Sequence, residues 1–179
     1  MVIRDSLMEA VTQTAKITDP YLSLLVQNEA KRFKIKTGVF LFLIQGSQIL
    51  LSRKTRAGID DGRYSVPTGG LESNETLTAA LIREAQEQTN IVLKNEHLLF
   101  CHAMHRNQPM LHDLSFQQID FFFRADHYDG LIKNKEPDQC ELRFYSLNNL
   151  PPTVPFIRHA IDCMLKGQIF SEYGWEKNS

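Results

Sequence analysis

Two glutamates and a glutamine near the middle of the chain could together bind a metal ion. Glu84 and Glu87 are three residues apart, and Gln88 follows Glu84 by four, so in a helix the three side chains occupy neighbouring positions of one face. Their oxygens suit a hard divalent cation such as Mg²⁺. Glutamates at this spacing most often form only a solvated helix face. Glu84, however, projects beside the apolar positions Leu77 and Ala80, where a carboxylate needs a compensating charge.

A glycine turn precedes these residues and favours a ligand site over a solvated face. Residues 66–70 read VPTGG, and paired glycines let the backbone turn tightly and approach an ion or ligand closely. Arg83 stands directly before Glu84 and can pair with Glu75 or Glu87. The turn and the helix together therefore predict a charged cluster that faces a tight backbone turn.

The segment that contains these residues, GGLESNETLTAALIREAQEQTNI, resembles the Nudix box of the MutT-like pyrophosphohydrolases. The pattern of that box is G-x5-E-x7-R-E-U-x-E-E-x-G-U, where U is an aliphatic residue. The positions that match in register are Gly69, Glu75, Arg83, Glu84, Ala85, Glu87 and Ile91. Gln88 replaces the last glutamate and Asn90 replaces the glycine. The resemblance extends over roughly residues 37–175, and residues 1–34 have no counterpart in it.

The resemblance implies both a fold class and a reaction. The fold would be α/β (α+β), a Nudix-type α/β/α sandwich on a mixed β-sheet. The activity would be hydrolysis, dependent on Mg²⁺ or Mn²⁺, of a pyrophosphate bond in a nucleoside diphosphate-linked substrate such as a (d)NTP or a related nucleotide. Glu84 and Glu87 would be catalytic residues and metal ligands. Glu75 and Arg83 would form a structural ion pair that fixes the loop to the helix.

Further metal ligands are implied by the same resemblance. The carbonyl of Thr68 and the amide of Gln88 would contribute oxygens, although a neutral amide weakens metal binding because affinity depends on ligand charge. In many Nudix enzymes a carboxylate outside the box completes the site. The first candidate for that carboxylate is Glu136, and behind it stand Asp138, Glu141 and Asp120.

Candidate substrate-binding residues are Arg53 and Lys54, which end a predicted strand and could contact phosphate, and the turn glycines Gly69 and Gly70. Basic residues at a strand end are about as often only solvated. His102 and His105 lie three apart on another predicted strand, so they point to opposite faces and do not form a metal pair.

The elements that must position these residues can be predicted from apolar periodicity and turn signals. We expect a helix over residues 75–89, which lack Gly and Pro, and a last helix over residues 154–166 with Gly167 as its stop. GVFLFLI and QILLS, separated by residues 45–48, read as a β-hairpin. Three more strands are predicted at LLFCHAM, IDFFFRA and LRFYSL, with a loop at residues 106–114 between the first two.

The amino-terminal part of the chain is expected to be a helical appendage over residues 1–34, followed by a Nudix hydrolase domain over residues 35–179. Thr18 or Asp19 can cap a helix with Pro20 at its first position. The apolar residues of this helix must be buried against the domain or against a second subunit, and a homodimer is one arrangement that would do so: Tyr21, Leu24, Leu25 and Val26.

Composition limits the partners. The chain has 20 Lys and Arg against 21 Asp and Glu, a net charge of -1, so we expect a small nucleotide as substrate, with no duplex nucleic acid and no membrane as partner. The basic residues 31–36 are too few to change this. The longest apolar run, residues 39–44, is far below the ~20 that a membrane span needs. Three cysteines without C-x-x-C spacing favour a reducing cytoplasm.

The main alternative to an enzyme is a Nudix-fold nucleotide-binding or regulatory module with weak or no hydrolysis. The departure at Gln88 favours it, because the lost carboxylate could have cost most of the activity. The retained residues Arg83, Glu84 and Glu87 favour the enzyme.

Overall fold

The computed structural model describes residues 20–54, 62–109, 115–134 and 140–175. The chain divides into two compact units, Met1–Lys34 and Ile35–Ser179. In the first unit, helix α2 (Pro20–Lys31) begins at the proline that the sequence places at its first position. Three of its apolar side chains, Tyr21, Leu24 and Leu25, are exposed in the single chain. Their burial against the domain or against a second subunit stays a prediction.

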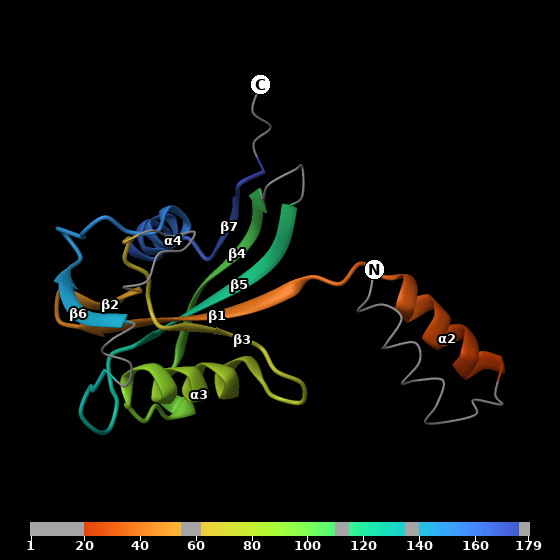
Figure 1. Cartoon of the computed structure of the whole chain (residues 1–179), viewed down its shortest axis with the longest axis horizontal. Helices are drawn as coiled ribbons and strands as arrows, with labels where there is room; N and C mark the ends of the chain where they lie inside the picture. The colour runs from red at the N-terminus through yellow and green to blue at the C-terminus, as the bar shows by residue number, and fades with distance from the viewer. Residues whose placement is uncertain (1–19, 55–61, 110–114, 135–139, 176–179) are drawn as a thin grey trace. The chain divides into compact units, whose positions relative to one another are not determined.

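The second unit is built on a mixed seven-stranded sheet (Figure 1). The strands lie in the order β6-β2-β1-β5-β4-β7, and β3 pairs with β1 outside this path. β1 and β5 run parallel, as do β4 and β7, whereas the other pairs are antiparallel. The strands are β1 (Lys36–Gln45), β2 (Gln48–Lys54), β3 (Thr68–Gly70), β4 (Leu99–Pro109), β5 (Ser115–Ala125), β6 (Cys140–Ser146) and β7 (Phe170–Tyr173).

Helices cover both faces of this sheet because its central strand is apolar on both sides. Along β1 successive side chains alternate between two cores. Phe40, Phe42 and Ile44 belong to the core that holds helix α4 (Pro155–Leu165). The side chains between them belong to the core that holds helix α3 (Leu77–Thr89). Figure 1 shows the two helices on opposite sides of the sheet, which confirms the predicted α/β/α sandwich on a mixed sheet.

Helix α3 is held at both ends by side-chain and backbone conformation. It begins at Leu77 and not at Glu75, because Thr76 is the N-cap and its hydroxyl accepts a hydrogen bond from the Ala79 backbone N–H at 3.2 Å. It ends at Asn90, whose φ of 64° is left-handed. The residue that replaces the family's glycine therefore adopts the backbone conformation that glycine favours.

Some elements differ from the sequence-based expectation. The predicted hairpin forms, with its turn at Gly46 in a left-handed conformation. The predicted loop over 106–114 is shorter, because β4 continues to Pro109 and β5 already begins at Ser115. β3, β7 and a short 3₁₀ helix, η1 (Asn95–His97), are not predicted by the sequence. Among the described residues, no helix is both long and apolar enough to cross a membrane.

Candidate active site

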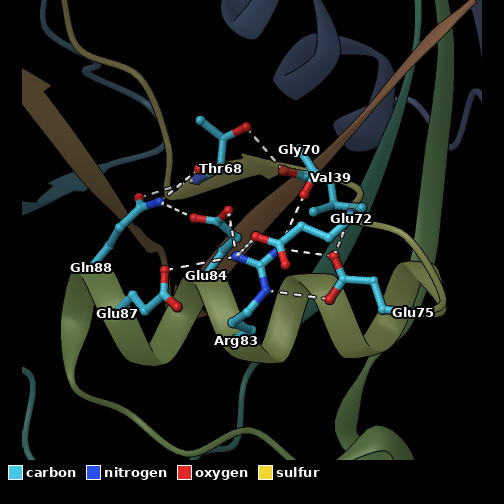
Figure 2. Close-up of polar contacts among 9 residues, drawn as sticks. All are labelled: Val39, Thr68, Gly70, Glu72, Glu75, Arg83, Glu84, Glu87 and Gln88. Atoms are coloured by element: carbon cyan, nitrogen blue, oxygen red, sulfur yellow. Dashed lines mark hydrogen bonds and ion pairs between the residues drawn. The ribbon is translucent and has the colours of Figure 1, made fainter. Parts of the chain in front are cut away.

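The centre of the site is the contact between Glu84 on α3 and the backbone of β3 (Figure 2). The Glu84 side chain is 16% exposed, and its carboxylate lies directly against Gly69. A Cβ atom built on Gly69 would lie 1.9 Å from Glu84 Cδ. No side chain other than glycine's therefore fits at position 69 while Glu84 stays in place.

Arg83 holds the glutamates around this contact, and its five N–H donors reach several oxygens at once. Its Nη2 donates to Glu75 Oε1 at 2.8 Å and to the Gly70 carbonyl at 3.1 Å. Its Nη1 donates to Glu84 Oε1 at 2.9 Å and lies 3.7 Å from Glu87 Oε2. One guanidinium thus links the glycine turn, the helix start and the two candidate catalytic carboxylates (Figure 2).

The ion pair of Glu75 and Arg83 shifts the pKa of both residues. The hydrogen bonds from Arg83, followed by one from the Glu72 backbone N–H, hold the pKa of Glu75 below its usual range. The hydrogen bonds to Glu75 and Glu84 in turn raise the pKa of Arg83. Arg83 is therefore a permanent cation beside Glu84.

Gln88 joins the same cluster from one turn further along α3. Its Nε2 donates to the Thr68 carbonyl at 2.6 Å and to Glu84 Oε2 at 2.9 Å. Its Oε1 accepts a hydrogen bond from the Thr68 backbone N–H at 3.3 Å. The Thr68 hydroxyl points away from the helix and donates to the Val39 carbonyl at 2.9 Å, which ties the turn to β1.

A cleft of about 610 Å³ opens beside this cluster. Its walls are residues 35–38 of the β1 start, residues 68–71 of β3 and the turn after it, and Gln118 of β5. Gly69 and Gly70, which the sequence predicts to form a tight turn and to bind substrate, lie instead in the extended strand β3, neither with a positive φ, and they line this cleft. A ligand in this cleft would have one end against the strand that contacts Glu84.

The oxygens at the turn suit a hard divalent cation. Thr68 O and Glu84 Oε2 come from different elements and converge on one nitrogen atom, so a single ion could contact both. Glu87 lies around the same guanidinium but is 60% exposed, on the open side of the cluster. Within the described residues, no three His, Cys, Asp or Glu side chains form a metal cluster by themselves. The residues fit an ion held by carboxylate and carbonyl oxygens together.

The arrangement of a glycine turn, an Arg–Glu pair and glutamates on the following helix agrees with a family match over most of the chain. The family model for the NUDIX domain matches residues 34–162. The chain belongs to the Nudix family. Its Nudix box is the segment Gly69–Ile91, and the contacts described above all lie within this box, its preceding turn and β1.

Individual members of the family match this chain only at low sequence identity. The ADP-ribose pyrophosphatase of Methanocaldococcus jannaschii is 29% identical over 109 residues, which cover 61% of this chain and 61% of that protein. The NAD-capped RNA hydrolase NudC of Pseudomonas aeruginosa is 25% identical over 135 residues, which cover 74% of this chain and 45% of the relative. This chain thus spans less than half of that relative's length.

Solved structures show the same fold. The MutT Nudix hydrolase of Burkholderia pseudomallei superimposes with a TM-score of 0.62 at 22% identity, over 73% of this chain and 98% of the other. A MutT protein of Bacillus halodurans gives a TM-score of 0.63 at 17% identity, over 78% of this chain and 90% of the other. The Nudix fold is therefore shared at identities that carry no information on substrate.

Two residues that the sequence names as candidates, Arg53 and Glu141, lie in a second cluster on β2 and β6. Arg53 Nη2 donates to Glu141 Oε2 at 2.6 Å, and the two residues are paired in register. Tyr64 donates to the same Glu141 oxygen at 3.1 Å. The hydrogen bond to Glu141 raises the pKa of Arg53. Burial, followed by hydrogen bonds with Tyr145 and Glu141, raises the pKa of Tyr64.

Other predicted residues are placed differently or lie outside the description. Lys54 pairs through its backbone with Cys140, but its side chain is not among those described. Glu136 and Asp138 lie outside the described residues. Asp120 is completely buried on β5 and accepts a hydrogen bond from Arg106 Nε at 2.6 Å. Its charge is therefore matched within the core by Arg106.

The buried network around Asp120 was not predicted from the sequence. Gln118 donates a hydrogen bond to Asp120 Oδ1. Arg106 also donates to Gln108, and its guanidinium carbon lies 3.9 Å from the centre of the Phe156 ring. Polar and aromatic residues that alternate along a strand do not indicate that an arginine and an aspartate will form a buried ion pair. His102 is buried and His105 is half-buried, on opposite faces of β4 as the sequence predicts.

Proposed function

We propose that the chain is a pyrophosphohydrolase that cleaves the diphosphate bond of a nucleoside diphosphate linked to a second group, with Mg²⁺ or Mn²⁺ as cofactor. The observation that carries this proposal is the convergence of Glu84 Oε2 and the Thr68 carbonyl on one point, with Arg83 fixing the second oxygen of Glu84. Thr68 and Gly69 of the same β3 backbone also line the cleft. A solvated helix face would not bring a carboxylate against the backbone of a strand from another part of the chain.

Oxygens of Glu84, Glu87 and Thr68 would hold the cation. When bound, such an ion neutralises diphosphate charge and lowers the pKa of an attacking water. Gly69 leaves room for the carboxylate, and the Gly70 carbonyl is kept in place by Arg83. The β3 backbone and one face of α3 thus supply the charge that binds the cation and the space that the carboxylate needs. Phosphoryl transfer depends on positioning of this kind.

Proton transfer is assigned to Glu84. Its carboxylate is fixed at both oxygens, so it can accept a proton from water at a defined position. Glu87, more exposed and only loosely paired with Arg83, is free to move toward a ligand. Arg53 and Lys54 would contact the phosphates from β2, which for Arg53 requires exchange of its Glu141 partner.

The family and the names of relatives support one substrate class. Two relatives are named for ADP-ribose and NAD-capped RNA, and ADP-ribose and NAD each contain adenosine diphosphate linked to a second group. These nucleotides and (d)NTPs share the pyrophosphate bond that the cluster would attack. We therefore propose small nucleotides of this class as substrates and a cytoplasmic location, which three free thiols support.

The test is a panel of ADP-ribose, NADH, ATP, dGTP and UDP-glucose, incubated with Mg²⁺, with Mn²⁺ or with EDTA. Release of nucleoside monophosphate, phosphate or pyrophosphate should be detected for at least one compound, only with metal, and should be lost in Glu84→Gln. If none is cleaved by folded protein in either metal, the hydrolase proposal fails.

The second candidate function is a nucleotide-binding module, and the contacts of Gln88 favour it. Its neutral amide occupies the oxygens that a cation would need. Calorimetric titration with the same panel separates the two functions. Saturable binding of a nucleotide that is not hydrolysed would support the binding module.

We also propose that residues 1–34 act in assembly and residues 35–179 in chemistry. The exposed apolar residues Tyr21, Leu24 and Leu25 on α2 support this division, because a contiguous apolar helix face is stabilised by burial in an interface. A homodimer would bury them in a second copy of the same helix.

A further inference from the structure

The amide group of Gln88 lies where a cation would have to bind. We propose that Gln88 is a displaceable competitor of the metal ion and not one of its ligands, so that metal binding requires the Gln88 side chain to leave its hydrogen bonds. This inference rests on the proposed metal-dependent function. It concerns the chain's own residues and can be tested on metal binding without any substrate.

The orientation of the amide is fixed by its partners. The Thr68 backbone N–H can only donate, so it must face Gln88 Oε1, which lies 3.3 Å away. The Thr68 carbonyl and the Glu84 carboxylate can only accept, so they must face Gln88 Nε2, at 2.6 and 2.9 Å. The –NH₂ group, and not the amide oxygen, is therefore aimed at the oxygens that the metal would use.

The candidate ligand oxygens of Glu84 and Thr68 each already accept a hydrogen bond. Glu84 Oε1 is taken by Arg83 Nη1 and Glu84 Oε2 by Gln88 Nε2, while the Thr68 carbonyl is taken by the same Gln88 nitrogen. The two hydrogens of one amide nitrogen thus do what a divalent ion would do, which is to join two oxygens from different elements.

The amide cannot become a ligand by rotating in place. A half-turn would put Nε2 against the Thr68 backbone N–H, donor against donor, and would put Oε1 against two oxygens. A bound ion could offset the repulsion between Oε1 and the two oxygens, but it could not offset the repulsion between the two N–H donors. Gln88 is only half-buried, so its side chain can instead swing toward solvent when an ion enters. A carboxylate at position 88 would place a charge against the same two oxygens, and it would therefore require a cation.

The test compares Mn²⁺ affinity by calorimetry in wild type, Gln88→Ala and Gln88→Met. Both variants remove the competing amide, and Met keeps the length of the side chain. Competition predicts that both bind Mn²⁺ about fivefold tighter than wild type or more, the factor expected for one net hydrogen bond no longer broken. The matched control is Gln86→Ala on the exposed face of the same helix, which should leave the affinity unchanged. Glu84→Gln should abolish binding and so locate the ion.

A second readout follows the amide itself. In ¹⁵N-labelled full-length protein, the side-chain amide resonance absent from Gln88→Ala is assigned to Gln88. Mg²⁺ should shift it to the position of a solvent-exposed amide and remove its protection from hydrogen exchange. Gln88→Glu should lower the thermal midpoint without metal and raise it with metal, relative to wild type.

The outcomes separate the two proposals. If Gln88→Ala and Gln88→Met bind Mn²⁺ more weakly than wild type, Gln88 is a ligand and the competition is wrong, while the metal-dependent function stands. If neither wild type nor any Gln88 variant binds Mn²⁺ or Mg²⁺, the metal-dependent function and the competition fail together. Tighter binding with a protected amide in wild type supports the competition.

Discussion

Glycine at position 69 has a steric reason that can be tested on its own. Neither Gly69 nor Gly70 has a positive φ, so alanine is acceptable to the backbone at both. The two positions differ in the space that is available for a side chain. A Cβ at Gly69 would lie 1.9 Å from Glu84 Cδ, whereas a Cβ at Gly70 would meet nothing within 4 Å. Alanine substitutions at the two positions therefore distinguish the effect of displacing the Glu84 carboxylate from the general effect of replacing a glycine.

We predict that Gly69→Ala turns the Glu84 carboxylate away from β3. Because the group displaced is the end of a flexible side chain, activity should fall more than stability. A shift of about 1 Å at a catalytic group can cost roughly 100-fold, and kcat/KM should fall by about this factor. The unfolding free energy of the Gly70→Ala control should change by no more than about 0.5 kcal/mol. Full Mn²⁺ affinity and activity in Gly69→Ala would contradict the steric account.

At the scale of elements, the end of α3 depends on one backbone conformation. Asn90 has φ 64°, its backbone N–H donates to the Gln86 carbonyl at 3.0 Å, and its side chain donates to the Leu131 carbonyl at 3.3 Å. Asparagine adopts this conformation more readily than most residues. It thus replaces the family's glycine without breaking the helix end.

Replacing Asn90 should distinguish the two contributions. Asn90→Ala should lower the unfolding free energy by about 1–2 kcal/mol, because a left-handed alanine is strained by roughly that amount. Asn90→Gly should stay within about 0.5 kcal/mol of wild type, since glycine has no Cβ to strain. Urea denaturation measures both. Equal losses in the two variants would mean that the bond to Leu131 is what matters.

The attachment of β7 to β4 depends on a buried imidazole. His102 is fully buried, and its Nδ1 donates to the Gln168 carbonyl at 2.8 Å, which leaves Nε2 to accept from the Ser171 hydroxyl at 2.9 Å. Burial lowers the pKa of His102. The folded chain therefore keeps this ring neutral at pH values where an unfolded histidine, with a pKa of about 6.5, takes a proton.

The sign of the resulting pH dependence is fixed. Below about pH 6.5 the unfolded state binds the proton that the folded state refuses, so the free energy of unfolding should fall as the pH is lowered from about 7.5 to 5.5. His102→Gln removes this titration, and its stability should fall less over the same range. Thermal midpoints of both proteins measured across that range test this. Parallel curves for the two proteins would contradict a lowered pKa at His102.

For the whole molecule, the parts that the sequence predicts well are those defined by local periodicity. The hairpin at Gly46 and helices α3 and α4 follow from apolar spacing and turn residues, and they appear within two residues of the expected bounds. The Nudix box places Glu84 on the correct face of its helix because helical spacing alone decides this.

The features that could not be predicted depend on pairing between distant segments. β3 is three residues long, two of them glycine, and exists only because it pairs with β1. The buried pair of Arg106 and Asp120 needs two adjacent strands in register. Likewise, the sequence treats Gln88 as a weakened ligand, and only the approach of the Thr68 backbone N–H shows which atom of the amide faces the cluster.

Deleting residues 1–33 tests the division of the chain at its largest scale. We predict that metal-dependent hydrolysis persists, because the family match begins at residue 34 and the Glu84 cluster and cleft lie in the second unit. The number of subunits, measured by light scattering, should fall if α2 mediates assembly. A truncated protein that stays folded with an unchanged number of subunits but loses hydrolysis would show that the appendage contributes to the site.

The most direct test of the central claim is the turnover of Glu84→Gln beside wild type on a cleaved nucleotide with saturating metal. The substitution removes one charge and little volume, so circular dichroism and the thermal midpoint should show a folded protein. We predict a loss of at least about 100-fold in kcat, as expected when a general base is removed. A folded Glu84→Gln that retains more than about a tenth of the wild-type rate would contradict the role of Glu84 as base and metal ligand.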